Sequence, residues 1–134
     1  MRHSKIIASG SYAPERVIKN EWFNERLGED VDTWLRENLT IRERRWMSED
    51  QSTSDLCVEA GNAALDMAGM QPKEIDLLII ATDTPDFISP STASAVQHKT
   101  GACQRHLYGY QYGLCGLSHG IDAGQQHDGD GSGL

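Results

Sequence analysis

The sequence predicts an α/β layered fold, because an amphipathic helix is followed closely by a short apolar strand. The helix begins at Thr53-Ser54-Asp55, whose short polar side chains can accept hydrogen bonds from the first free backbone N–H groups. It ends at Gly69, and its apolar residues recur at spacings of three and four: Leu56, Ala60, Ala63, Ala64 and Met67. After a turn at 71–74 comes the apolar run 75–81, which is typical of a strand covered on both faces.

Weaker signals predict the other elements of the first 102 residues. A short strand is expected at 5–8, and the turn at 10–14 ends it. Asn20 is expected to cap a helix that stops at Gly28, and a second helical piece covers 32–38. The segment 41–46 alternates weakly, which indicates an edge strand. A last helix is expected to start at Ser91 and stop at Gly101.

Length, charge and hydropathy exclude several classes of protein. A chain of 134 residues has the length of one domain, and a net charge of −8 has the wrong sign for a nucleic-acid partner. The longest apolar run is far shorter than the roughly 20 residues of a membrane span, and no apolar signal core follows the N-terminus. With 3 cysteines and no secretion signal, a disulfide framework is not expected and a cytoplasmic location is.

The composition changes abruptly near Ala102. Residues 1–102 contain every Glu, Lys and Pro of the chain and read as ordinary globular protein. Residues 103–134 are rich in Gly and His and contain few aliphatic side chains, too few to offset the entropy of ordering the backbone. We therefore expect one folded segment at 1–102 and a disordered tail at 103–134.

Seven motifs in the first segment occur together in one known family. Residues 1–102 resemble the N-terminal part of β-ketoacyl-acyl carrier protein synthase III, a member of the thiolase superfamily. The motifs stand in the family's order and approximate spacing: Gly10-Ser11-Tyr12-x-Pro14, Trp34, Ile41-Arg42-Glu43-Arg44-Arg45, Thr53-Ser54-Asp55-Leu56, Ile75-Asp76-Leu77, Ala81-Thr82-x-Thr84-Pro85-Asp86 and Pro90-Ser91-Thr92-Ala93.

The resemblance implies the fold and the chemistry of the intact family. The fold has five αβαβα layers, of which this chain holds only the first strands and helices, and family members form homodimers. They load an acyl group from coenzyme A onto a cysteine thiolate at a helix N-terminus, whose partial positive charge stabilises thiolate. Condensation with malonyl-acyl carrier protein then releases carbon dioxide, with no further cofactor. His and Asn from the later half of family chains stabilise the charge that develops on the thioester oxygen. The resemblance also implies that the strand at 75–81 is central in the complete enzyme, and in this chain we expect it to lack neighbouring strands.

The resemblance assigns a substrate-binding role to Trp34. This residue matches the family's tryptophan that stacks on the adenine of coenzyme A, and the alternative is a core or interface aromatic. Family chains usually carry an arginine four residues later, where Asn38 stands here. Arg36 is the candidate replacement for that cation.

Two further groups of residues have competing interpretations. Arg42, Arg44 and Arg45 either clamp phosphate or form a solvated strand face, and the solvated face is favoured. Phe87 and Ile88 stand in a loop that, in the family, lies at the dimer interface near the acyl pocket. They either line that pocket or simply pack.

The tail is compatible with a displaced reading frame. Family chains continue past this point with a pattern close to Asn-Ala-x-x-Phe-Asp-Ile-Asn-x-Ala-Cys-Ala-Gly-Phe, which contains the nucleophilic cysteine. Reading from the second base of each codon, residues 104–118 can encode Asn-Ala-Thr-Phe-x-Asp-Ile-Asn-Thr-Ala-Cys-Ala-Gly-Phe. We therefore hypothesise a frameshift or a sequencing error near codon 102, which leaves this chain without the catalytic set and inactive.

Three other interpretations of the same residues stay open. Cys115 is the one alternative nucleophile, although its flanking residues do not match the family in the given frame. Four residues have a spacing that fits a tetrahedral zinc site: Cys103, His106, Cys115 and His119. The chain as a whole is alternatively a non-catalytic partner subunit of a full-length synthase.

Overall fold

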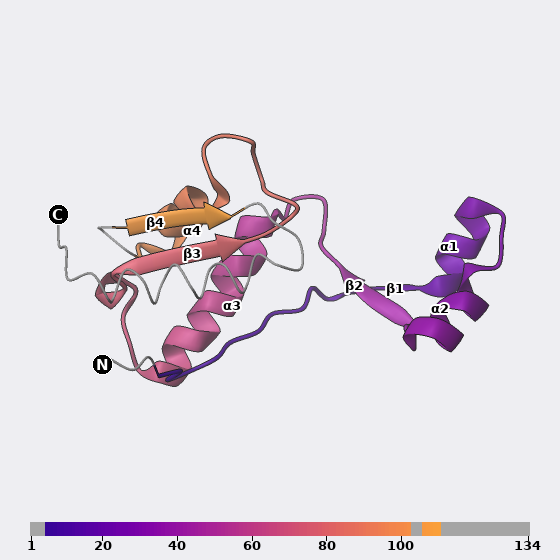
Figure 1. Cartoon of the computed structure of the whole chain (residues 1–134), viewed down its shortest axis with the longest axis horizontal. Coiled ribbons are helices and arrows are strands. Elements are labelled where there is room, and N and C mark those ends of the chain that lie inside the picture. The colour runs from indigo at the N-terminus through magenta and orange to yellow at the C-terminus, as the bar shows by residue number, and fades with distance from the viewer. Residues whose placement is uncertain (1–4, 103–105, 111–134) are drawn as a thin grey trace. The chain divides into compact units, whose positions relative to one another are not determined.

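The computed structural model describes residues 5–102 and 106–110, and its contacts divide the chain into two compact units (Figure 1). Residues 13–51 form the small unit, and residues 1–12 together with 52–134 form the large unit. Among the described residues, each unit contains two strands and two α-helices, and the large unit also contains one short 3₁₀ helix. Within the described ranges, no helix has the length and apolar character needed to cross a lipid bilayer.

The small unit is a pair of strands that flanks a pair of helices in the sequence. Strand β1 (Arg16–Lys19) leads directly into α1 (Asn20–Leu27), which is followed by α2 (Val31–Leu39) and β2 (Glu43–Trp46). The strands are antiparallel, with Arg16 opposite Trp46 and Lys19 opposite Glu43. Ile18 is 6% exposed and is the buried apolar residue of this pair.

The large unit contains a parallel strand pair with a helical crossover. Its elements are α3 (Thr53–Ala68), the short 3₁₀ helix η1 (Pro72–Glu74), β3 (Leu77–Ala81), α4 (Thr92–Thr100) and β4 (His106–Tyr110). Strands β3 and β4 are parallel and in register from Leu77 opposite His106. Helix α4 connects them, as a parallel pair requires, and it packs against α3 and both strands (Figure 1).

Local capping explains where the helices of the large unit begin and end. Ser52 and Asp55 form a reciprocal capping box at the start of α3, and the Ser91 side chain accepts a hydrogen bond from the Ser94 backbone at the start of α4. Gly69 and Gly101 end these helices in the left-handed conformation, at φ values of 66° and 68°. The predicted bounds of both helices are therefore confirmed.

Two predictions about the N-terminal third are wrong. Residues 5–8 form no strand, and the following chain instead passes close to α3, where Gly10 lies against the Ala60 carbonyl oxygen (Figure 1). Asn20 lies inside α1 rather than capping it, and the N-cap residue is Lys19. Strand β1 was not predicted, and it consists of only 4 residues.

The expectation that the strand at 75–81 has no neighbour is also wrong. This strand is β3, and β4 pairs with it from within the segment 103–134. The side chains of β3 from Leu77 to Ile80 are half-buried rather than fully covered on both faces. Whether residues 103–134 are out of frame stays a prediction.

Few apolar side chains are fully buried in the described part of the chain. The buried apolar residues are Pro14, Ile18, Ala93, Val96 and Ala102. On α3, the predicted apolar face is only partly covered, because Met67 is 68% exposed. A large exposed apolar surface of this kind favours association with further protein.

Candidate functional site

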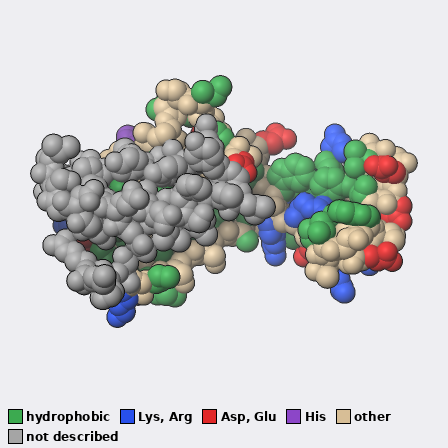
Figure 2. Space-filling model, in the orientation of Figure 1, with side chains coloured by type: hydrophobic (Ala, Val, Ile, Leu, Met, Phe, Trp, Pro, Cys, Tyr) green, Lys and Arg blue, Asp and Glu red, His purple; other side chains and the backbone are tan. Residues whose placement is uncertain are grey.

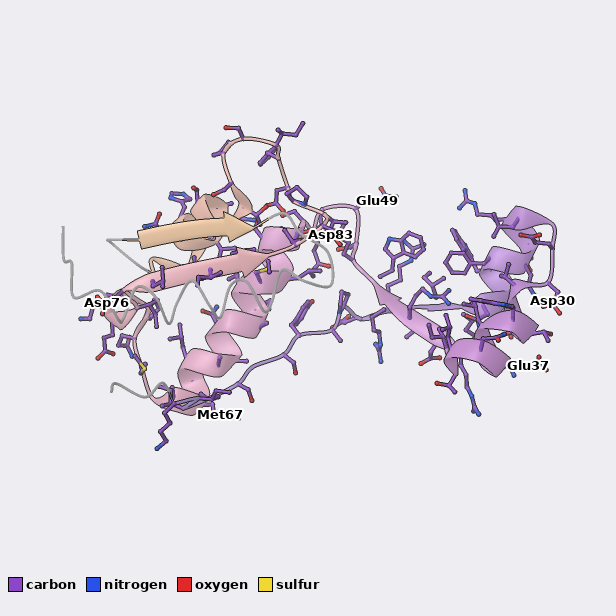
Figure 3. All side chains as sticks on the ribbon, viewed as in Figure 1. Asp30, Glu37, Glu49, Met67, Asp76 and Asp83 are labelled. Atoms are coloured by element: carbon purple, nitrogen blue, oxygen red, sulfur yellow. The ribbon has the colours of Figure 1, made fainter. Side chains whose placement is uncertain are left out.

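The candidate ligand residues Trp34 and Arg36 both lie on α2. Asp30 caps this helix by accepting hydrogen bonds from the Thr33 backbone N–H (3.2 Å) and the Thr33 hydroxyl (2.6 Å). Figure 3 labels Asp30 at the turn before the helix. The Trp34 side chain is 57% exposed, so its ring is not a core residue of the small unit. An exposed indole on a firmly capped helix is available for stacking.

The Arg36 guanidinium is already paired with carboxylates. Its Nε donates to Asp32 Oδ1 at 2.8 Å, and its Nη2 lies 3.7 Å from Glu21 Oε1. The pKa of Asp32 is lowered, first by the hydrogen bond from Asn20 and then by Arg36. Arg36 must therefore exchange these carboxylates for a phosphate before it can act as the predicted cation.

A wholly buried asparagine links three elements of the small unit. Asn20 Nδ2 donates to Asp32 Oδ1 at 2.7 Å and to the Ile41 carbonyl at 2.8 Å, and Asn20 Oδ1 accepts from Arg44 Nη2 at 2.6 Å. The sequence did not predict this centre, since the partners of Asn20 lie 12 to 24 residues away. The available signal for it was a polar residue two positions after Val17-Ile18 of β1.

The three neighbouring arginines do not form a uniformly solvated face. Arg44 is half-buried, with its guanidinium 4.3 Å from the centroid of the Phe23 ring. Its Nη1 atom is buried without a hydrogen-bond partner, and the ring face beneath the guanidinium partly compensates. Arg45 Nη1 donates to the Glu15 carbonyl at 3.0 Å, whereas Arg42 is exposed. Arg44 is thus structural, contrary to the solvated-face expectation.

Aromatic residues from α1 and β2 form one wall of a cavity. Trp22 and Trp46 meet edge to face with their centroids 5.4 Å apart, and Phe23 stacks on Trp46 at 6.1 Å. The cavity has a volume of about 330 Å³, and the described residues that line it all belong to the small unit: Arg16, Trp22, Arg26, Trp46, Met47, Ser48, Glu49 and Gln51. Figure 2 shows hydrophobic side chains beside Lys and Arg side chains on this unit.

In the large unit, Asp86 fixes the loop that precedes α4. Its Oδ1 accepts from the Ser54 backbone N–H at 3.0 Å, its Oδ2 accepts from the Ser52 hydroxyl at 3.2 Å, and its own N–H donates to the Thr92 hydroxyl at 3.0 Å. A carboxylate at the start of α3 also interacts favourably with the helix dipole. Asp86 thereby ties this loop to both α3 and α4.

The two residues after Asp86 carry exposed apolar side chains. Phe87 is 59% exposed and Ile88 is 97% exposed. Phe87 and Ile88 were expected either to line the acyl pocket or simply to pack. Because Ile88 is almost fully exposed, it does not pack against the described residues. A rigidly held loop that presents two apolar side chains is suited to contact with another protein surface.

An ion pair joins α4 to the start of α3. Lys99 Nζ lies 2.5 Å from Asp55 Oδ1 and donates to the Ser54 hydroxyl at 2.7 Å. The hydrogen bond from Lys99, followed by those from Ser52, lowers the pKa of Asp55 to about 2. Asp55 is thus a structural carboxylate and is poorly suited to acid or base catalysis near neutral pH.

The described cysteine is not an activated nucleophile. Cys57 lies on α3 and is half-buried, and burial, followed by the Asp86 carboxylate, raises the pKa of its thiol. Cys103, Cys115 and His119 lie outside the described residues. For His106 the structure describes the backbone in β4 but not the side chain. Both the alternative nucleophile and the zinc set therefore stay predictions.

Curated relatives decide the family. The β-ketoacyl-acyl carrier protein synthase III of Clostridium perfringens is 42% identical over 125 residues, which cover 93% of this chain and 38% of the relative. The chain belongs to the β-ketoacyl-acyl carrier protein synthase III family. An acetoacetyl CoA synthase of a Streptomyces species is 45% identical over 98 residues, or 73% of this chain and 30% of that protein. No family model matches the chain.

Solved structures of this synthase family confirm the fold. The 3-oxoacyl-acyl carrier protein synthase III of Aquifex aeolicus matches with a TM-score of 0.82 and 30% identity, over 95% of this chain and 41% of that structure. The mixed α/β arrangement is that of the N-terminal part of a thiolase-like synthase, as predicted. The chain spans less than half the length of the synthase III relatives that it matches.

Proposed function

We propose that residues 1–102 are the coenzyme A-binding beginning of a synthase III-type condensing enzyme. The intact enzyme transfers an acyl group from coenzyme A to a cysteine and condenses it with malonyl-acyl carrier protein, in fatty-acid initiation or a related cytoplasmic pathway. The exposed indole of Trp34 on α2 is the observation that carries this assignment. It supports stacking on adenine, which is worth about 1–3 kcal/mol per base.

Two other parts of the chain have roles in this proposal. Arg36 turns from Asp32 toward a phosphate of coenzyme A when the ligand is bound, because its side chain is 51% exposed and free to reorient. The loop with Phe87 and Ile88 contacts a second copy of the enzyme, next to the acyl pocket. Its fixation by Asp86 and its exposed apolar side chains support that role.

We further propose that the polypeptide does not catalyse condensation, because residues 103–134 are read in a displaced frame. The abrupt change of composition supports this proposal, and so do the shifted codons, which can spell ten of the eleven residues that the family pattern specifies. A chain read in this way has no family cysteine in residues 103–134. Transfer of the acyl group to that cysteine is then not available.

A second candidate function has specific support. An alignment of 125 residues with the Clostridium relative exceeds the 102 residues of the first segment, so it includes part of the tail. Strand β4 lies in this tail and pairs with β3. Both observations favour a tail that is translated in its correct reading frame. In that case Cys115, which lies five residues after β4, accepts the acyl group.

Binding of coenzyme A tests the first proposal. We expect Trp34→Leu to weaken binding to the 134-residue chain by about tenfold or more, since one base-stacking interaction is lost. Trp34→Phe is expected to restore part of the affinity. Leu39→Ala is the matched control, because it removes an exposed apolar side chain from the same helix without removing a ring. Equal affinity of wild type and Trp34→Leu contradicts the assignment.

Acyl transfer separates the two candidate functions. The chain is incubated with radiolabelled acetyl-coenzyme A, and covalent label is measured in the wild type and in Cys115→Ser. The displaced frame predicts no label in either protein. Label that is present in the wild type and lost in Cys115→Ser establishes the second candidate.

A further inference from the structure

We propose that the cavity of the small unit binds a small planar aromatic anion, meaning an aromatic ring that carries a carboxylate or a phosphate. This site goes beyond the proposed coenzyme A site, because Trp34 and Arg36 do not line the cavity. The proposal depends on neither the reading frame nor the condensation reaction.

The cavity has the size of a small-molecule site and is built by one compact unit. Its volume of about 330 Å³ falls within the range of roughly 300–1,000 Å³ that ligand pockets usually have. Residues from β1, α1, β2 and the segment after β2 line it. Since all of them belong to the small unit, the cavity does not depend on how the two units are arranged.

Two packed indole rings supply an apolar wall. Trp22 contacts Phe23 edge to face at 4.8 Å and Trp46 at 5.4 Å, so its ring is held from two sides. Trp46 also stacks with Phe23, with an angle of 14° between the two ring planes, yet it stays 38% exposed. A rigid and partly open pair of indoles favours a planar aromatic ligand, which loses little entropy on stacking.

Two guanidinium groups supply the positive charge. Arg16 lines the cavity from β1, and Arg26 lies over the Trp22 ring at 4.6 Å from its centroid. Within residues 5–102, neither of these arginines forms an ion pair with a carboxylate. A guanidinium group matches the planar geometry of a carboxylate or phosphate, and both side chains are exposed and able to reach it.

Glu49 opposes anion binding, so variants of Glu49 and Arg26 are expected to change the affinity in opposite directions. It lines the same cavity and follows β2, where Figure 3 labels it. Its carboxylate repels an anion, so removal of this charge is expected to tighten binding. Loss of Arg26 is expected to weaken binding for the opposite reason.

Indole resonances of the full chain provide the most direct measurement. The chain has three tryptophans, of which Trp22 and Trp46 line the cavity and Trp34 does not. Titration of the ¹⁵N-labelled protein with 2-naphthoate or 2-naphthyl phosphate is expected to shift the first two indole signals saturably and to leave the third unchanged. The uncharged 2-naphthalenemethanol is expected to bind about tenfold more weakly, because it lacks the charge-assisted hydrogen bonds.

Matched variants complete the test. With 2-naphthoate as probe, Arg26→Gln is expected to weaken binding about tenfold and Glu49→Gln to tighten it. Arg42→Gln removes an equal charge from an exposed residue that does not line the cavity, and it is expected to leave binding unchanged. The proposal is overturned if neither anion gives a saturable shift, if Trp34 responds instead, or if the uncharged probe binds equally well.

The outcome is independent of the coenzyme A proposal. Loss of coenzyme A binding in Trp34→Leu with intact naphthoate binding supports both sites. If the chain does not bind coenzyme A at all, the response of Trp22 and Trp46 to 2-naphthoate still decides this proposal.

Discussion

Each of the two units is stabilised internally by a different kind of contact. In the small unit, the wholly buried Asn20 hydrogen-bonds to residues 12, 21 and 24 positions away, and aromatic rings of α1 and β2 pack against one another. In the large unit, residues within three positions cap the starts of α3 and α4, and hydrogen bonds of Asp86 and Lys99 link separate elements. The small unit therefore depends on one centre, whereas the large unit distributes its stability over several local ones.

The largest expected effect follows from removal of the small unit's polar centre. Asn20→Ala deprives Asp32, Arg44 and the Ile41 carbonyl of a partner. Groups left unpaired near the interior cost about 1–3 kcal/mol each. We expect the small unit to lose about 3 kcal/mol, measured as faster amide hydrogen exchange across α1, α2 and β2.

An asparagine on the surface is the matched control for this substitution. Asn38 Nδ2 donates only to the Trp34 carbonyl of its own helix, at 2.9 Å. Asn38→Ala is expected to change stability by less than about 0.5 kcal/mol. If the two variants exchange equally fast, the small unit has no single polar centre.

Gly10→Ala is expected to have the next largest effect, and it acts on the large unit. A Cβ atom at this position would lie 2.2 Å from the Ala60 carbonyl oxygen and 2.4 Å from the Ala64 backbone nitrogen. Because both atoms belong to the backbone of α3, the N-terminal segment must move away, at a cost of about 2 kcal/mol. Mass-spectrometric hydrogen exchange should show lost protection in α3 near residues 60–64 with the small unit unchanged.

Asp86→Ala tests the link between α3 and the following loop. It removes two hydrogen bonds at the start of α3, and we expect a loss of about 1.5 kcal/mol. The loop with Phe87 and Ile88 should become more accessible to limited proteolysis. Asp83→Ala is the control, since Asp83 is an exposed acid just after β3 in Figure 3. Equal proteolysis of both variants would show that Asp86 does not fix the loop.

The smallest effect concerns the pH dependence of the large unit. The pKa of Asp55 is lowered from 3.8 to about 2, so its ion pair with Lys99 contributes fully above about pH 4 and is lost as the pH falls through 2. Because both side chains are about one third exposed, we expect the contribution to be less than about 1 kcal/mol. Lys99→Met should remove this part of the acid dependence, and Lys73→Met should retain it.

The contrast between local contacts in the large unit and distant contacts in the small unit explains which elements the sequence could predict. The start and end of α3 and α4 depend on Ser, Asp and Gly residues next to those ends, and such local signals are visible in the sequence. Strand β1 and the role of Asn20 depend on partners across a gap of many residues, which no local pattern specifies. The strand expected at 5–8 is absent because an apolar segment forms a strand only where another strand pairs with it.

The candidate site shows the same division between local and distant signals. The exposure of Trp34 agrees with its assignment from the family motif. The aromatic cavity was not foreseen, since Trp22 and Trp46 are 24 residues apart and belong to different elements. Nor did the sequence indicate that Arg36 is paired with Asp32 and Glu21, which depends on how α1 and α2 pack.

The nucleotide sequence of the encoding DNA tests the central claim most directly. We expect the codons after Ala102, read from their second base, to spell the family pattern with its cysteine and to continue into the remaining length of a synthase. Codons for Leu114 and Cys115 that cannot give TGT in the shifted frame would contradict a displaced frame. Cys115 would then be the acyl-accepting candidate of the chain.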